Sequence, residues 1–294
     1  MLADNHYYGH LEVLRQYAGV ELPWPMPGRL QHGWTPGPGL GVTHFAEPWP
    51  KFVWAERNLA QCREAGYRDV VGLGSPWLYL PPPPPRRTPP PRSLLVYPFH
   101  GWEKEKLHGD MRAYADALDV LRAEGFGPIT VCLYWMEFED ADIRGLFAER
   151  GFEVITNGRR DGNPSFLHGQ RESILDHAYV TSNRVCTATF YALSAGRPFF
   201  LYGPSMGLSQ TQDPSGEEFA AWQAREFPEL LFERFGDVCH RDLGLRELGA
   251  PLVRSPEELR RLLCWRKRQS PKLVKRRVAR ELWRFAALRP WLTR

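Results

Sequence analysis

Short apolar runs alternate with amphipathic segments along most of the chain after residue 93. The runs predict buried strands, and the segments, whose apolar residues recur every three or four positions, predict helices that pack on a core. We expect strands at residues 94–97, 129–134, 152–156, 178–180 and 199–202, and helices at 108–124, 141–150, 166–176, 185–195, 217–225 and 256–265. Strands that alternate with helices of this length predict a doubly wound parallel sheet.

The first 80 residues repeat this pattern on a smaller scale. Helices are expected at 9–17 and 55–65, and strands at 29–34, 52–54 and 69–72. The proline-rich segment 81–92 follows, and it favours a stiff polyproline II conformation that cannot join a sheet. We interpret it as a linker, with a ligand for a proline-reading domain as the alternative.

Together these patterns predict an α/β protein with two Rossmann-like lobes. The expected parts are a small N-terminal lobe (1–80), the linker (81–92), a larger nucleotide-binding lobe (93–255) and a basic helical tail (256–294). No run of 18 apolar residues and no signal-like start occurs, so neither a membrane span nor a signal peptide is expected. The five cysteines contain no CxxC pair, which indicates a reducing cytosol and argues against a zinc ribbon or a disulfide framework.

Charge is distributed unevenly between the body of the chain and its end. Residues 260–294 hold 13 Lys or Arg and one acidic residue, a net +12, and the net charge of +4 for the whole chain therefore leaves −8 for residues 1–259. An acidic body argues against a nucleic-acid-binding core. We expect the tail to hold a cytoplasmic protein at the inner, anionic face of a membrane. The alternatives are a helix that packs back across the lobes and, with less support, a nucleic-acid contact.

A candidate phosphate site follows the strand expected at 178–180. Thr181, Ser182 and Asn183 favour helix N-caps, so the N–H groups at 184–186 and the positive end of the helix dipole would face an anion. Tyr202 follows the next strand at the same edge of the sheet, where ligands bind in such folds. The alternative is that the triplet only caps a structural helix.

This segment resembles the donor-binding segment of GT-B transferases that build bacterial surface polymers. It is similar to the serine motif of CDP-glycerol glycerophosphotransferases and of sialyl- and keto-deoxy-octulosonate transferases that use CMP-sugars. The resemblance covers most of residues 28–205 and implies a GT-B fold, with Ser182 and Asn183 at the position where those families hold the donor phosphate by paired Ser or Thr. It rests on the polar triplet, Thr187, Phe190, Tyr191, Ala192, Gly196, Pro198 and Tyr202.

Two histidines stand where strands are expected to enter loops. His32 lies in a Gln-His-Gly-Trp element that resembles the QHG or WHG element of several polymer-building GT-B transferases, and a histidine there can act as a general base towards an acceptor hydroxyl. His100, in a Pro-x-His element, resembles the His-Pro motif of CMP-sialic acid transferases, whose histidine contacts the donor phosphate. The alternatives are histidines that only stabilise turns.

Further candidates are charged residues in predicted loops and helix starts. Arg159 can neutralise a pyrophosphate or a sugar carboxylate, and Glu217 can bind ribose hydroxyls, as the resemblance implies. The alternatives are that Arg159 lies in a solvated loop and that Glu217 only stabilises the first turn of a helix. Asp140 is expected to cap a helix, and His6 with His10 lacks further ligands nearby, so no metal is expected.

The sequence therefore predicts a metal-independent transferase without a cofactor. It would move a sugar, or a polyol phosphate, from a CMP- or CDP-activated donor to a surface glycan or a lipid-linked acceptor, and no nucleic-acid partner is expected. Two alternatives remain open, a nucleotide-sugar 2-epimerase and a non-catalytic subunit of a glycan-assembly complex.

Overall fold

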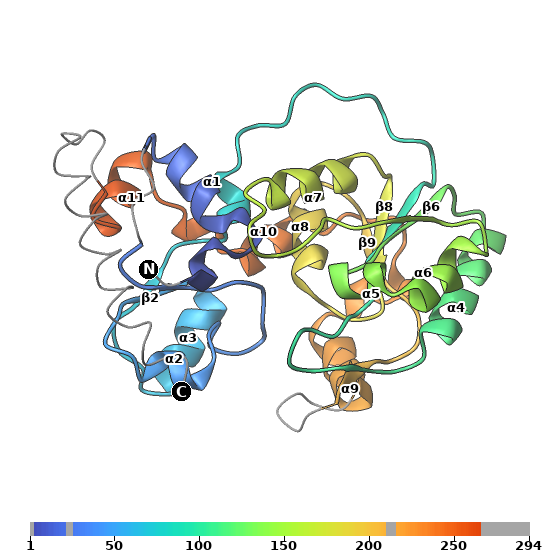
Figure 1. Cartoon of the computed structure of the whole chain (residues 1–294), viewed down its shortest axis with the longest axis horizontal. Helices are drawn as coiled ribbons and strands as arrows, with labels where there is room; N and C mark the ends of the chain where they lie inside the picture. The colour runs from blue at the N-terminus through green and yellow to red at the C-terminus, as the bar shows by residue number, and fades with distance from the viewer. Residues whose placement is uncertain (1–2, 22–25, 210–215, 266–294) are drawn as a thin grey trace.

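The computed structural model describes residues 3–21, 26–209 and 216–265, which form two lobes (Figure 1). The N-terminal lobe carries a three-stranded parallel sheet in the order β1-β2-β3. Helix α3 connects β2 to β3, and the segments η1 and α1 precede the sheet in the chain. The elements are η1 (Ala3–Gly9), α1 (His10–Tyr17), β1 (Arg29–Leu30), α2 (Val42–Phe45), β2 (Lys51–Val53), α3 (Glu56–Glu64), β3 (Val70–Gly72) and η2 (Pro76–Tyr79).

The C-terminal lobe is a five-stranded parallel sheet in the order β7-β6-β4-β8-β9. A separate antiparallel pair is formed by β5 and β10. The elements are β4 (Leu94–Val96), β5 (Leu107–His108), α4 (Met111–Ala123), β6 (Ile129–Cys132), α5 (Trp135–Glu139), α6 (Ala141–Ala148), β7 (Glu153–Ile155), α7 (Phe166–Leu175), β8 (Tyr179–Ser182), α8 (Thr187–Ser194), β9 (Phe199–Leu201), β10 (Gly207–Leu208), α9 (Gly216–Glu226), α10 (Arg241–Glu247) and α11 (Pro256–Leu262). The predicted α/β class with two Rossmann-like lobes is confirmed.

The two lobes share an apolar core. Trp77 of the N-terminal lobe stacks on Tyr191 of α8, with ring centroids 4.2 Å apart and an interplanar angle of 7°. The indole N–H of Trp77 also donates to Ser194 Oγ, over 3.0 Å. A second cluster lies between the large sheet and its helices, and it includes Leu94, Leu118, Phe147 and Phe200. The shared core is one cluster of buried apolar residues that extends from α1 to α8 and α11. The two lobes are therefore packed against each other and not only joined by the linker.

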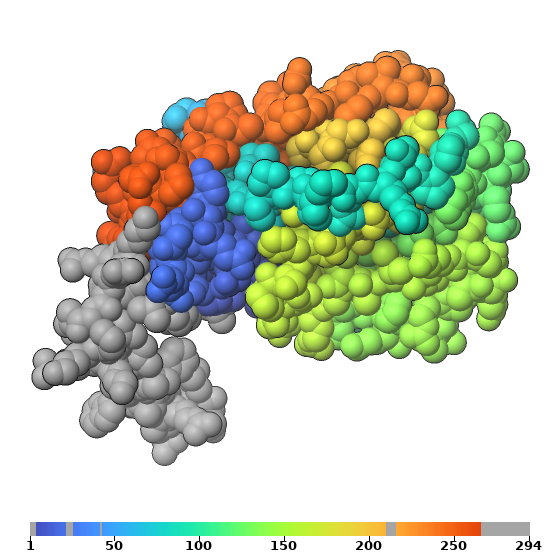
Figure 2. All heavy atoms as spheres, turned by 90° about the horizontal axis from the view of Figure 1, so that it is seen from above, coloured from blue at the N-terminus to red at the C-terminus, as the bar shows by residue number. Residues whose placement is uncertain are grey.

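The linker 81–92 has no helix or strand, as its prolines predict, and it crosses from one lobe to the other over the molecular surface (Figure 2). Its Arg86 pairs with Glu172 at 3.3 Å and with Asp176 at 2.5 Å, both at the end of α7. Arg171 of the same helix donates to the carbonyl of Pro81. These contacts fix the linker along α7.

The chain returns to the N-terminal lobe after α10. Ser75 N–H donates to Leu248 O over 2.8 Å, and Arg260 of α11 donates to Ala18 O over 2.6 Å. Figure 1 shows α11 beside α1, at the far end of the molecule from the large sheet. The rest of the predicted basic tail, 266–294, lies outside the described residues. No helix of the described chain is long and apolar enough to cross a membrane.

Several predicted boundaries differ from the structure, among them the strand expected at 29–34, which ends at Leu30, and one difference matters for the site. The helix expected to start directly after Thr181, Ser182 and Asn183 begins only at Thr187. Strand β8 instead continues through Ser182, where it pairs with Leu201. The reason lies in the side chains, because Thr181 Oγ1 donates to Phe200 O over 2.8 Å and Ser182 Oγ donates to Arg184 O over 2.9 Å. Both hydroxyls therefore bind the main chain of the loop and sheet, and neither caps a helix.

Candidate functional site

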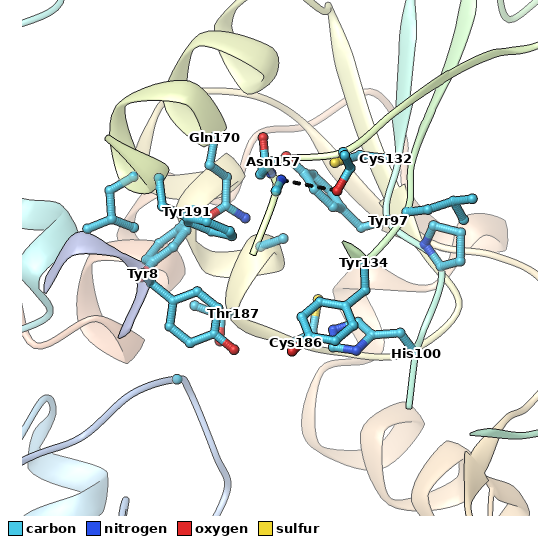
Figure 3. A pocket seen from close by; sticks show the side chains of 18 of the residues that line it. Tyr8, Tyr97, His100, Cys132, Tyr134, Asn157, Gln170, Cys186, Thr187 and Tyr191 are labelled. Carbon is cyan, nitrogen blue, oxygen red and sulfur yellow. Dashed lines mark hydrogen bonds between the residues drawn. The ribbon is translucent and has the colours of Figure 1, made fainter. Parts of the chain in front are cut away.

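A cavity of about 220 Å³ lies between the two lobes at the carboxyl edge of the large sheet. The loops after β4, β6, β7 and β8 form one wall, and Tyr8, His10, His32 and Gly33 of the N-terminal lobe form the other. Figure 3 shows Tyr8 on the opposite side of the cavity from His100 and Tyr134. The site is therefore built only when both lobes are in place.

The order of the strands explains why the cavity lies here. From the central strand β4 the chain crosses through α4 to β6, whereas from β8 it crosses through α8 to β9 on the other side. The loops after β4 and β8 therefore leave the sheet in opposite directions and open a crevice between them. Ligands of open α/β sheets bind at this switch point.

The N-terminus of α8 opens on the cavity. Cys186, Thr187 and Ala188 line it, and the N–H groups of Thr187 and Ala188, in the first helical turn, make no hydrogen bond to another described residue. Cys186 and Thr189 satisfy each other instead, since Cys186 N donates to Thr189 Oγ1 over 3.1 Å and Thr189 N to Cys186 O over 3.1 Å. Two free N–H groups and the positive end of the helix dipole favour an anion at this point.

The structure does not leave main-chain N–H groups free where the sequence predicts them. The N–H groups at 184–186 were expected to be free, but Val185 N donates to Gln223 Oε1 over 2.8 Å and Arg184 N to Ser182 Oγ over 3.3 Å. Cys186 N is bonded as described above. The free donors start one residue later, with the true start of the helix.

Three of the predicted site residues line the cavity: His32, His100 and Thr187. Thr187 Oγ1 accepts a hydrogen bond of 2.9 Å from the main-chain N–H of Trp34, which leaves the hydroxyl proton of Thr187 for another acceptor. His100 Nδ1 lies 2.6 Å from Gly101 O, and its ring stacks on Tyr134 with centroids 4.2 Å apart. The structure therefore brings together one residue from the N-terminal lobe and two from the C-terminal lobe.

The other predicted site residues do not line the cavity. Asn183 is buried, and it joins two loops by accepting from Phe99 N and donating to Pro204 O, both over 2.9 Å. The hydroxyl of Ser182 is hydrogen-bonded to the main chain of Arg184. The remaining three lie on loops and surfaces: Arg159 is 54% exposed and stacks on Trp135, Tyr202 packs on Phe232, and Glu217 is exposed in the first turn of α9. Their predicted contacts with a donor stay predictions.

Burial keeps the histidines of the cavity neutral at pH 7. The pKa of His32 is lowered to about 4, mainly by burial. Burial lowers the pKa of His100, and it lowers the pKa of His10 well below its usual value, with the nearby His32 adding to the effect. A neutral imidazole offers one donor and one acceptor. The three rings can therefore accept a proton or a hydrogen bond at physiological pH.

The phenols of the cavity are also neutral. Burial raises the pKa of Tyr8, Tyr97, Tyr134 and Tyr191 above the usual value for tyrosine. No Asp, Glu, Lys or Arg of the described residues lines the cavity. Within the same described ranges no group of three or more His, Cys, Asp or Glu is placed to hold a metal ion.

His10 is the residue that sequence reasoning missed most clearly. It is 1% exposed, it lines the cavity, and neither ring nitrogen has a hydrogen-bond partner among the described residues. The sequence offered only its spacing from His6, which suggested a metal site and was set aside. Tyr97 and Asn157 stand at the ends of predicted strands, next to candidates that were chosen, but they were not selected themselves; Gln170, within a predicted helix, gave no sequence signal.

Comparisons with known proteins assign no family. No protein-family model matches the sequence, and no curated protein matches it. Among solved structures, the S. aureus MnaA-UDP co-structure is similar over 75% of this chain, with 11% sequence identity and a TM-score of 0.42. The match spans 61% of the length of that chain.

Proposed function

We propose that the protein is a metal-independent glycosyltransferase that binds a nucleotide-activated donor in the cavity between its lobes. The observation that carries the proposal is the N-terminus of α8, whose free N–H groups at Thr187 and Ala188 open on the cavity at the switch point of the sheet. Phosphate is the group for which such a helix start is best suited. The donor phosphate is therefore placed against α8.

The acceptor enters from the side of the N-terminal lobe. His32 stands on that wall, and because its pKa is about 4, its imidazole is unprotonated at neutral pH. In this form it can take the proton of an acceptor hydroxyl as that hydroxyl attacks the donor. A low pKa makes it a weak base in the resting protein, so its role depends on a geometry in which the hydroxyl is held against it. By the sequence resemblance, the acceptor is a surface glycan or a lipid-linked precursor, and the donor carries CMP or CDP.

Nucleotide binding tests this proposal directly. Thermal unfolding is followed with CMP, CDP, UDP and GDP in turn, each in large excess. A ligand that binds only the folded protein raises its stability by about 2.7 kcal/mol at 100 times its Kd. The proposal predicts such a rise for at least one nucleotide, and the resemblance predicts that cytidine nucleotides give the largest one. No rise with any of the four contradicts the proposal.

A further inference from the structure

The interior of the cavity carries polar groups but no formal charge among the described residues. Its donors and acceptors are imidazoles, phenols, amides and hydroxyls. Of the two nearby arginines, Arg160 pairs with Glu103 at 2.7 Å and also hydrogen-bonds to the phenol of Tyr8 at the edge of the cavity. Arg159 lies on the face of Trp135, 3.9 Å from its ring centroid. Neither arginine is among the residues that line the cavity.

Among the residues that line the cavity, those at the start of α8 favour an anion. If the donor phosphate takes that place, a carboxylate on the sugar would find no cation among the lining residues, and the nearest guanidinium, that of Arg160, is already paired with Glu103. An ionised group removed from water without a partner is strongly disfavoured. A hydroxyl group, in contrast, needs only one donor and one acceptor, and the walls supply both.

His10 provides a specific partner for such a hydroxyl. A buried polar atom without a hydrogen bond is costly, and His10 has two of them, on a ring that is 1% exposed and lines the cavity. One ring nitrogen donates and the other accepts, so the nitrogen that faces the cavity can bond a hydroxyl group in either role. Gln170, Asn157 and Tyr97, which Figure 3 shows around the cavity, line the same space as His10.

The size of the cavity limits what it can enclose. Pockets for drug-sized ligands measure about 300–1,000 Å³, and this one measures about 220 Å³. This volume is smaller than a whole nucleotide-sugar requires, so we expect one sugar ring to lie inside, with its phosphate at α8, and the nucleoside to extend through the opening of the cavity.

We propose that the cavity selects an uncharged, hydroxyl-rich sugar ring as the transferred group, and that His10 binds one of its hydroxyls. This inference rests on the proposed function and departs from the acidic sugars that the sequence resemblance includes. It makes His10 a specificity-determining residue that contacts the donor.

Matched donors test the charge of the sugar. UDP-glucose and UDP-glucuronate share their nucleotide and differ at C6 by a carboxylate, as do GDP-mannose and GDP-mannuronate, and CDP-glucose and CDP-glucuronate form the same pair for cytidine. Calorimetric titration is expected to show at least tenfold tighter binding of the neutral member for the nucleotide that binds. Equal binding, or tighter binding of the acidic member, would overturn this inference and leave the proposed function standing. If no donor and no free nucleotide binds, the proposed function fails and the inference fails with it.

Variants of His10 test its role with two readouts. His10→Phe keeps an aromatic ring, larger than imidazole, and removes both unsatisfied nitrogens, so it is expected to weaken binding of the neutral donor at least tenfold. Binding of the nucleotide alone should change less than twofold, and His10→Asn should recover part of the sugar-dependent affinity. His108→Phe, on the exposed strand β5, is the control and should leave both affinities unchanged. A His10→Phe protein that binds donor and nucleotide as the wild type does overturns the assignment.

Discussion

The main-chain N–H of Trp34 donates a hydrogen bond of 2.9 Å to Thr187 Oγ1, and this bond joins the two lobes at the cavity. Trp34 ends the Gln-His-Gly-Trp element that carries His32, and Thr187 is the first residue of α8. The rings of Trp34 and Phe190, 4.7 Å apart, reinforce the same contact. The candidate base and the candidate phosphate site are therefore held at a fixed separation by a contact between the lobes.

This arrangement predicts separate effects on turnover and on donor binding. His32→Ala is expected to lower kcat by about 10²- to 10⁴-fold, the usual contribution of a general base, and to leave donor affinity within about twofold. Steady-state kinetics and calorimetric titration measure the two quantities. An equal loss of donor affinity would show that His32 contacts the donor instead.

Acid should destabilise the protein through its buried histidines. The folded-state pKa of His32 is about 4, below the value of 6.5 for an unperturbed histidine, so the unfolded state binds more protons between these values. Stability therefore falls as the pH drops from about 6.5 to about 4, by about 3 kcal/mol for His32 alone. Urea unfolding at pH 7 and pH 4 measures this change. His32→Asn should reduce the loss and His108→Asn should not; equal losses in the two variants would contradict the assignment.

The contact between the lobes also depends on a glycine. Gly249 has φ of 76°, and a Cβ at this residue would lie 1.9 Å from Trp54 O. Gly66 has a similar φ of 72° but nothing within 4 Å of its Cβ position, which makes it a matched control. Gly66→Ala is expected to cost about 1–2 kcal/mol of stability, the cost of the left-handed conformation alone. Gly249→Ala should cost clearly more, as measured by urea unfolding, and equal costs would mean that the contact is not tight.

The basic tail remains a prediction from the sequence. Its residues 266–294 lie outside the described part of the structure, and its charge predicts binding to anionic membranes that weakens with salt, because the Debye length falls from about 10 Å at 0.1 M to about 3 Å at 1 M. Co-sedimentation with vesicles that contain anionic lipid, at both salt concentrations, is the measurement. If the full chain does not bind at low salt, or if removal of residues 271–294 leaves binding unchanged, the membrane prediction is wrong.

Local patterns were enough to predict most strands and helices of the two lobes. They failed where contacts between distant parts of the chain determine which element forms. Thr181 and Ser182 are favourable both in strands and at helix caps, and only the positions of Phe200 O and Arg184 O, set by the fold, select the strand. Helix α10 was not predicted because Arg241–Glu247 has few apolar residues and a central glycine. Gly244 permits a close approach to α8, where a Cβ would lie 2.6 Å from Ser194 N.

The candidate site was less predictable than the fold. His32 and His100 stand where predicted strands enter loops, at the edge where ligands bind in such folds, and the family resemblance favoured them and added Thr187. His10 is at the start of a helix in the other lobe, and nothing in the sequence places it beside residues 186–191. Its importance follows from burial without a partner, which only the structure shows.

The most direct test of the account places a negative charge at the start of α8. Thr187→Asp keeps an acceptor for Trp34 N–H and suits the first turn of a helix, so the fold should persist. Its carboxylate would occupy the place proposed for the donor phosphate. Ala141→Asp puts the same residue at the first position of α6, away from the cavity, as the control. Binding is measured by calorimetric titration with the nucleotide that stabilises the wild type. We predict at least 100-fold weaker binding to Thr187→Asp and unchanged binding to Ala141→Asp. Wild-type affinity in a folded Thr187→Asp protein would contradict the phosphate site on which the proposed function rests.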